Sequence, residues 1–242
     1  MAEMVKPYKN SDKTKKEQVA EMFDTISGNY DGLNRVISFG IDVSWRQKVL
    51  KLVAAQQPES VLDIATGTGD LAILMTQTSA KKIVGVDISK GMIDVGYKKI
   101  KEQNLSDKIT FQIADSENLP FENNSFDAIT VAFGIRNFEN LEKGLSEIYR
   151  VLKPNGIFVV LETSNPTKFP FKQGYFFYSK YILPTIGRLF SKDKVAYQYL
   201  SESASKFPFG KAMYNIFAKI GFIDIQVLPQ TFGVATIYHA RK

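Results

Sequence analysis

Carboxylates and glycines lie close together in the segment VLDIATGTGD, residues 61–70. Asp63 stands inside a run typical of a buried strand, and Asp70 directly follows the glycines. Gly67 and Gly69 can adopt left-handed backbone conformations and let a ligand approach the main chain closely. A glycine-rich turn at the end of a parallel strand is typical of a site for a nucleotide-like ligand.

The same segment fits the dinucleotide fingerprint G-x-G-x-x-A through Gly67, Gly69 and Ala72, and Asp87 follows at the usual distance. This pattern alone does not separate NAD from other adenosine ligands. The two acids beside the glycines would repel a pyrophosphate, whereas they suit a ligand that carries an amine and a sulfonium. We therefore favour S-adenosylmethionine (SAM) as the ligand and keep an NAD-linked oxidoreductase as the alternative.

Acceptors for the rest of SAM follow at the next two predicted strand ends. Asp87 ends KKIVGVD, where its carboxylate can accept hydrogen bonds from both ribose hydroxyls. Asp115, in IADSENLPF, can accept from an adenine amino group. Taken singly, Asp63 could cap a loop, Asp87 could cap a helix and Asp115 could be a turn residue. Their succession along neighbouring strands favours one extended ligand.

Alternating strand and helix patterns place these acids at one edge of a parallel sheet, which predicts an α/β fold with helices on both faces. Strands are expected at 60–64, 81–87, 109–114, 126–133 and 156–162, with helices at 70–78, 89–103 and 140–152. A helix at 210–220 precedes GFIDIQVLPQ and VATIYHARK, which predict an antiparallel pair at the sheet edge. Two further helices are expected at 16–30 and 42–56, separated by a break at NYDGLN.

These segments resemble the class I SAM-dependent methyltransferases. The resemblance is carried by VLDIATGTGD, GVDIS, IADSENLPFENNSFDAITVAFGIRNF and YRVLKPNGIFVVLE. FDTISGNYDGLNRVISFGID and FGIRNFEN are similar, more specifically, to the ubiquinone/menaquinone C-methyltransferase family, and the similarity covers about residues 17–242. Two departures are visible: Thr66 stands where the family often has glycine, and Ala132 stands where relatives can carry serine.

The resemblance implies a seven-stranded Rossmann-like sheet of order 3-2-1-4-5-7-6, with strand seven antiparallel. It implies methyl transfer from SAM to a ring carbon of a prenylated quinol, and we favour demethylmenaquinol as the acceptor. The ubiquinone precursor and another small phenolic or lipid acceptor stay open. The family's SAM contacts map onto Thr68, Asp87, Asp115 and Ser116. The expected cofactor-binding residues are Asp63, Gly67, Thr68, Gly69, Asp87, Met92, Asp115 and Ser116.

Methylation of a ring carbon beside a hydroxyl sets two tasks. The methyl group must be held in line with the carbon, and the hydroxyl proton must be removed or the phenolate stabilised. The only histidine, His239, lies close to the C-terminus, so the candidate catalytic residues are Tyr30, Arg136 and Asn137. Arg136 stays protonated and would stabilise the oxyanion. Asn137 could fix a water, and no metal is expected.

Composition indicates a globular protein with a mild positive charge. There are 31 basic and 25 acidic residues and no cysteine among 242 residues, which favours a reducing compartment such as the cytoplasm. We expect no nucleic-acid partner and leave a homo-oligomer open. Residues 1–16 are expected to be a flexible basic N-terminus. Residues 17–242 would form one domain, with a helical lid at 17–57 and an aromatic insertion at 165–210.

The aromatic insertion interleaves phenylalanine and tyrosine with lysine, as in FPFKQGYFFYSKYILPTIGRLF. It could pack as a cap over the site. It could also guide a polyprenyl tail and rest on the inner face of the membrane, with its basic residues near lipid head groups. The two interpretations are compatible.

Overall fold

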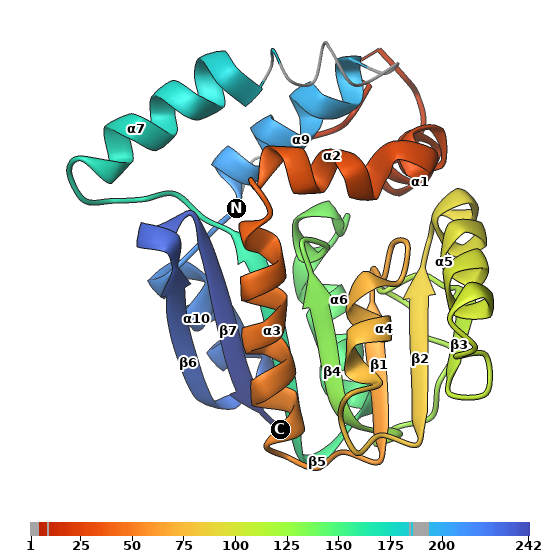
Figure 1. Cartoon of the computed structure of the whole chain (residues 1–242). Coiled ribbons are helices and arrows are strands. Elements are labelled where there is room, and N and C mark those ends of the chain that lie inside the picture. The colour runs from red at the N-terminus through yellow and green to blue at the C-terminus, as the bar shows by residue number, and fades with distance from the viewer. Residues whose placement is uncertain (1–4, 9, 184, 186–193) are drawn as a thin grey trace.

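A seven-stranded sheet forms the centre of the molecule (Figure 1), in the order β3-β2-β1-β4-β5-β7-β6. The computed structural model describes residues 5–8, 10–183, 185 and 194–242. The strands are β1 (Ser60–Ile64), β2 (Lys82–Asp87), β3 (Ile109–Ile113), β4 (Phe126–Ala132), β5 (Leu152–Thr163), β6 (Ile223–Gln230) and β7 (Ala235–Arg241). β1 to β5 pair in parallel, and β7 runs antiparallel to both of its neighbours. The predicted order and the reversed strand are confirmed.

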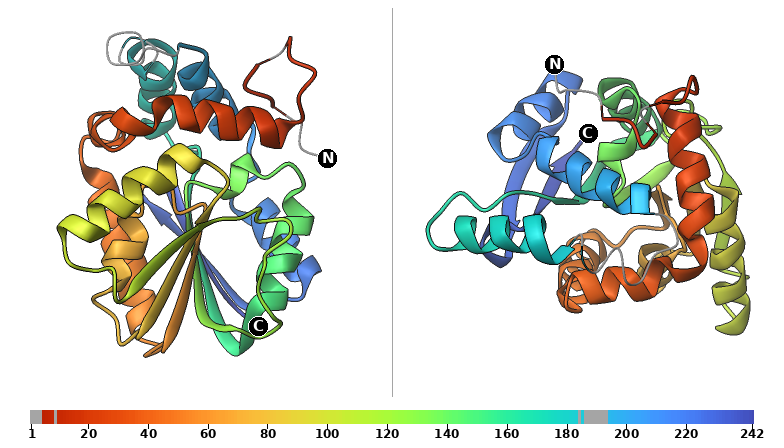
Figure 2. Two further views of the ribbon diagram at one scale, coloured as in Figure 1. Left: turned by 90° about the vertical axis from the view of Figure 1, so that its right-hand side faces the viewer. Right: turned by 90° about the horizontal axis from the view of Figure 1, so that it is seen from above.

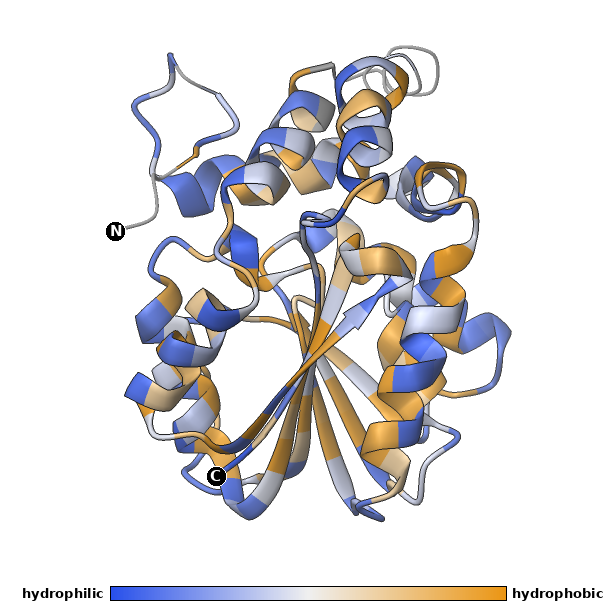
Figure 3. Cartoon of the chain, turned by 90° about the vertical axis from the view of Figure 1, so that its left-hand side faces the viewer, coloured by the Kyte–Doolittle hydropathy of each residue, from blue (hydrophilic) through white to orange (hydrophobic). Residues whose placement is uncertain are grey.

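Helices cover both faces of the sheet. One face is covered by α3 (Ile41–Ala54), α4 (Asp70–Met75) and α5 (Lys90–Glu102), and the other by α6 (Leu141–Val151) and α10 (Lys211–Ile220). Successive side chains along each strand point to opposite faces of the sheet. Val61 therefore packs in the core under α3, α4 and α5, whereas Leu62 and Ile64 pack in the core under α6 and α10. The strands are accordingly coloured as hydrophobic along most of their length (Figure 3).

A third group of helices lies across the carboxyl ends of the parallel strands (Figures 1 and 2). It consists of α1 (Lys15–Ile26), α2 (Tyr30–Ile37), α7 (Phe171–Phe177) and α9 (Lys194–Lys206). A separate apolar cluster joins α1 and α2 to α9 and to Met92 of α5. The short elements are η1 (Ser27–Asn29), η2 (Ile135–Asn137), the π-helical turn η3 (Tyr178–Ile182) and η4 (Thr231–Gly233).

The predicted break at NYDGLN is wrong in its position. The chain turns at Ser27–Asn29, and α2 begins at Tyr30 and continues through Gly32. A Cβ at Gly32 would meet no atom within 4 Å. Leu33 is only 5% exposed, and burial of such a side chain outweighs the low helix propensity of glycine. β5 begins at Leu152, four residues before the predicted strand, because Leu152 pairs with Phe126 ahead of a register shift in the ladder. α4 ends at Met75, three residues before the predicted end. Apart from the helix interrupted at Ser27–Asn29, the remaining expected elements begin and end within about two residues of the predicted positions.

Candidate active site

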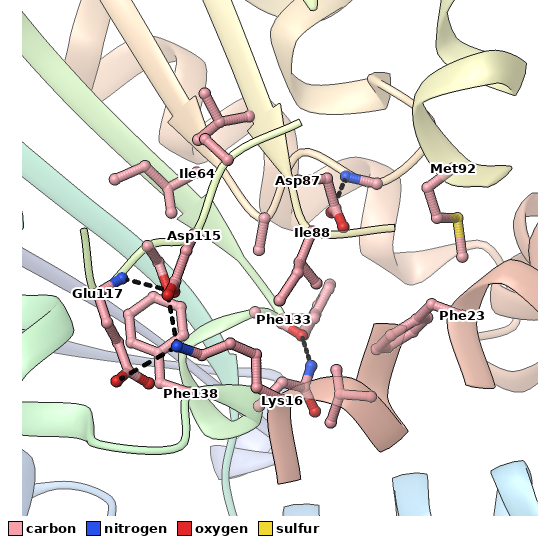
Figure 4. Close-up of a pocket in the computed structure, with 18 of the residues that line it drawn as sticks. Lys16, Phe23, Ile64, Asp87, Ile88, Met92, Asp115, Glu117, Phe133 and Phe138 are labelled. Atoms are coloured by element: carbon pink, nitrogen blue, oxygen red, sulfur yellow. Dashed lines mark hydrogen bonds and ion pairs between the residues drawn. The ribbon is translucent and has the colours of Figure 1, made fainter. Parts of the chain in front are cut away.

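A pocket lies where the carboxyl ends of β1 to β4 meet α1 and α2 (Figure 4). Its walls come from five segments that are distant in sequence, which the parallel sheet brings to one edge. The predicted site residues that line it are Tyr30, Gly67, Asp87, Met92, Asp115, Ser116 and Asn137.

Asp87 is held rigidly at the end of β2. Its Oδ2 accepts from the Gly67 amide at 2.8 Å, and its Oδ1 accepts from the Ser89 amide at 2.9 Å. Burial raises the pKa of Asp87, although these backbone donors act in the opposite direction. An ionised carboxylate has about four acceptor positions, so Asp87 can accept two more hydrogen bonds from a ligand in the pocket.

Asp115 faces the pocket from the end of β3 and already has a cationic partner. Its Oδ1 accepts from the Glu117 amide at 2.9 Å, and its Oδ2 forms an ion pair with the ammonium of Lys16. Lys16 extends from α1 toward the pocket, and its ammonium also lies 4.0 Å from the Glu117 carboxylate (Figure 4). A ligand amine that donates to Asp115 must therefore share this carboxylate with Lys16. The sequence analysis did not identify Lys16 as a residue of the site.

Asp63 lies behind the pocket and does not line it. It is 1% exposed, and its carboxylate accepts from the hydroxyls of Thr66 at 2.6 Å and Thr130 at 2.7 Å. Burial raises the pKa of Asp63 to about 6, although both hydroxyl donors lower it. Thr66, which stands where the family often has glycine, thus fixes the glycine loop to Asp63.

Thr68 and Gly69 also turn away from the pocket. Lys99 of α5 donates to the Thr68 hydroxyl at 2.9 Å and to the Asp70 carboxylate at 2.7 Å. Burial raises the pKa of Asp70, but Lys99 outweighs this and lowers the pKa below its usual value. At Gly69, where φ is +85°, a Cβ would lie 2.4 Å from Cζ of Phe111. This half of the loop packs on α5 and β3, and Asp70 is neutralised there.

A second cavity adjoins the first, and Tyr30 and Phe133 line both. Arg136 lines the second cavity, where its Nη1 lies 2.7 Å from Oε1 of Glu162 at the end of β5. The two side chains are 7% and 1% exposed. Burial acts to lower the pKa of Arg136, but Glu162 raises it above the ordinary value. Arg136 Nε has no hydrogen-bond partner within the described ranges.

The other two catalytic candidates flank the junction of the cavities. Asn137 lines the first cavity, and its Oδ1 accepts from the Tyr199 hydroxyl of α9 at 3.1 Å. Burial raises the pKa of Tyr30, so its hydroxyl is protonated at neutral pH and can donate but not act as a base. Sequence reasoning missed Tyr199 and Glu162; only Glu162, at a strand end, offered a signal.

The seven-stranded order with a reversed strand seven and a pocket at the strand ends is the arrangement of a class I SAM-dependent methyltransferase. Solved structures share this fold. The chain resembles a SAM-dependent methyltransferase from Thermotoga maritima, with a TM-score of 0.65, 20% identity and coverage of 92% and 99% of the two chains. It also resembles the [4+2]-cyclase SpnF, with a TM-score of 0.65, 18% identity and coverage of 94% and 96%. At these identities the similarity shows the fold alone.

More narrowly, the chain belongs to the ubiE/COQ5 methyltransferase family, whose sequence model matches residues 11–242. It is 49% identical to the demethylmenaquinone methyltransferase of Bacteroides fragilis, over 99% of this chain and 98% of the relative. It is 43% identical to the enzyme of that name in Porphyromonas gingivalis, with the same coverage. A ubiquinone/menaquinone biosynthesis C-methyltransferase of Geotalea daltonii is 45% identical, over 94% and 97% of the two chains.

Proposed function

We propose that this protein transfers a methyl group from SAM to a ring carbon of a prenylated quinol, with demethylmenaquinol as the acceptor. The observation that carries the proposal is a strand-end pocket with free acceptor positions on Asp87, joined at Tyr30 and Phe133 to a cavity that contains a charged arginine. The names of the Bacteroides and Porphyromonas relatives support a menaquinone precursor. The ubiquinone precursor and other phenolic or lipid acceptors are the alternatives.

SAM is the methyl donor of the proposed reaction. Its ribose hydroxyls would donate to Asp87, and its adenine amino group would donate to Asp115, with Ser116 beside it. Apolar side chains of Ile88 and Met92 line the same pocket and offer surface for the adenine ring. Asp63, Thr68 and Gly69 act less directly in this proposal, because they hold the glycine loop in shape.

The acceptor ring would occupy the second cavity, on the far side of Tyr30 and Phe133. The quinol hydroxyl would lose its proton to a water that Asn137 positions, electron density would move into the ring, and Arg136 would stabilise the negative oxygen. The ring carbon would then form a bond to the methyl group as the sulfur–carbon bond breaks and S-adenosylhomocysteine leaves, and the proton on that ring carbon would pass to water, which restores the aromatic ring. Tyr30 can donate to a quinol oxygen, and Asn137, fixed by Tyr199, can position a water.

A labelling assay tests the proposal. The purified protein is incubated with methyl-labelled SAM and either a reduced demethylated naphthoquinone or the corresponding benzoquinone. We expect label in the naphthoquinol. Label only in the benzoquinol would support the ubiquinone alternative, and label in neither would contradict quinol methylation.

We further propose that the protein is cytoplasmic and contacts the inner face of a membrane through α7 and η3. Within the described ranges, no helix has the length and apolarity needed to cross a bilayer. α7 extends beyond the sheet on the side of β6 (Figure 1). Phe176, Phe177 and Tyr181 are more than half exposed, and the Lys180 ammonium lies 5.4 Å from the ring centroids of Phe176 and Tyr181. Exposed aromatic residues beside lysine are typical of interfacial segments.

Vesicle sedimentation checks this contact. We expect the protein to pellet with anionic phospholipid vesicles at low salt, and Phe176→Ser/Phe177→Ser to reduce the bound fraction severalfold. The same surface could instead mediate contact between copies of the chain. Sedimentation velocity without lipid distinguishes this alternative from membrane binding. Self-association that the same substitutions abolish, without vesicle binding, would favour an oligomer.

A further inference from the structure

An apolar groove adjoins the second cavity. The residues common to the cavity and the groove are Ile37, Ser38, Trp45, Tyr175, Tyr178 and Val234. None of the described residues that line the groove carries a charge. The donor pocket, the second cavity and the groove therefore lie next to one another in this order, and the uncharged lining of the groove suits an uncharged, apolar ligand.

Three aromatic side chains from distant segments meet at the mouth of this groove. Phe39 lies between α2 and α3, Phe171 begins α7, and Phe232 lies in η4. Phe39 and Phe232 are 72% and 67% exposed. The rings of Phe171 and Phe232 are stacked, with centroids 3.7 Å apart and an interplanar angle of 5°. A cluster of exposed apolar side chains of this kind often marks a site that binds a ligand or a partner.

Three phenylalanines that line the pocket, the second cavity or the groove have positive φ angles. Phe39, Phe133 and Phe232 have φ values of +51°, +57° and +58°. Bulky residues rarely adopt positive φ, and such strain is kept mainly where it serves a ligand site. Phe133 stands between donor and acceptor cavities, and the other two stand at the groove mouth.

Two hydrogen bonds join the segments that form the groove walls. The Tyr178 hydroxyl donates to the Ile37 carbonyl at 2.6 Å, which fixes the aromatic insertion to α2. Trp45 Nε1 donates to the Thr231 hydroxyl at 2.9 Å, which fixes η4 to α3. The groove is therefore preformed, so a flexible ligand would meet an ordered surface.

We propose that this groove holds the isoprenoid tail of the acceptor and that Phe39, Phe171 and Phe232 form its exit. The inference rests on the proposed function, because it places the quinol ring in the second cavity. The methyl group of SAM must approach the reacting carbon from one face of the ring, whereas a tail bonded to the neighbouring carbon starts in the plane of the ring. The groove adjoins the second cavity and shares six lining residues with it, so it can receive a tail that leaves the ring in that plane. Branched, uncharged isoprene units match the lining, and the open mouth lets a tail longer than the groove continue outward.

The test uses Phe39→Asn/Phe232→Asn, because asparagine tolerates positive φ well and the double variant should fold. The control is Tyr214→Asn, an exposed aromatic residue on α10. Two acceptors are compared in the same detergent: the naphthoquinol ring without a tail, and the ring with four isoprene units. We expect the double variant to raise KM for the tailed acceptor roughly tenfold or more through lost apolar contact, and to change kcat/KM for the bare ring less than about twofold. Equal losses on both acceptors, or no loss on the tailed one, would overturn the inference.

A second readout does not depend on catalysis. Trp45 is the only tryptophan of the chain and lines both the cavity and the groove. Titration with geranylgeraniol should change its fluorescence saturably in the wild type and in Tyr214→Asn, and weakly in the double variant. If the wild type binds this alcohol but methylates neither acceptor, the proposed function is contradicted and the apolar groove is still supported as a binding site. If the wild type methylates both acceptors but its fluorescence does not respond, the proposed tail site is contradicted and the proposed function stands.

Discussion

Asp87→Ala should weaken SAM binding by at least about 100-fold, as measured by isothermal titration calorimetry. The carboxylate is fixed by the Gly67 and Ser89 amides and has acceptor positions left for both ribose hydroxyls. A hydrogen bond to a charged group contributes about 1.5–3 kcal/mol, and each 1.4 kcal/mol changes an equilibrium constant tenfold. The substitution also leaves two backbone donors without their acceptor, so the glycine loop loses its fixed shape.

Asp94→Ala is the matched control for this experiment. Asp94 lies on α5, is 54% exposed and pairs with Lys90 at 2.6 Å, and it does not line the pocket. Its removal should leave SAM affinity within about twofold, since exposed ion pairs contribute little. Asp87→Asn, which keeps one acceptor oxygen, should fall between the two. An Asp87→Ala protein that binds SAM within threefold of the wild type would remove Asp87 from the donor site.

The positions of Asp87 and Asp115 could be predicted because they depend on one rule of the fold. Carboxyl ends of consecutive parallel strands meet at one sheet edge, and the strand pattern fixes which residues stand there. The same rule would have found Glu162, which ends the strand beside β4 in the predicted order and so lies close to Arg136. A search for a counter-charge to a buried arginine would have named it.

The orientation of the glycine loop could not be predicted from sequence. Asp63 pairs in register with Gly85 and Thr130, and which of these neighbours offers a hydroxyl is decided only by strand pairing. Gly69 was predicted for its backbone freedom, which its φ of +85° confirms. The close approach of the Phe111 ring depends on a contact between distant segments, which no local pattern carries. Likewise, α2 forms because Leu33 is buried by other helices, not because of its own propensity.

Removal of the Arg136 charge should have the second large effect, on turnover rather than on SAM binding. Arg136 lines the second cavity, in which we place the acceptor ring, and does not line the first pocket, in which we place SAM. Loss of a donor aimed at a developing oxyanion typically lowers kcat about 100- to 1,000-fold. We therefore expect this loss in Arg136→Gln, with the SAM dissociation constant within about threefold of the wild-type value.

Stability complicates the single variant, because Glu162 is 1% exposed and would lose its counter-charge. Breaking a buried ion pair from one side typically costs about 3–5 kcal/mol. The double variant Arg136→Gln/Glu162→Gln removes both charges and keeps the hydrogen-bonding groups, so its free energy of unfolding in urea should return close to the wild-type value. If Arg136 acts on the reaction, kcat of the double variant stays low although the fold is restored. If kcat recovers together with stability, the arginine serves only to neutralise Glu162. Phenolate stabilisation must then be assigned to another group, and Tyr30 is a candidate because it lines both cavities.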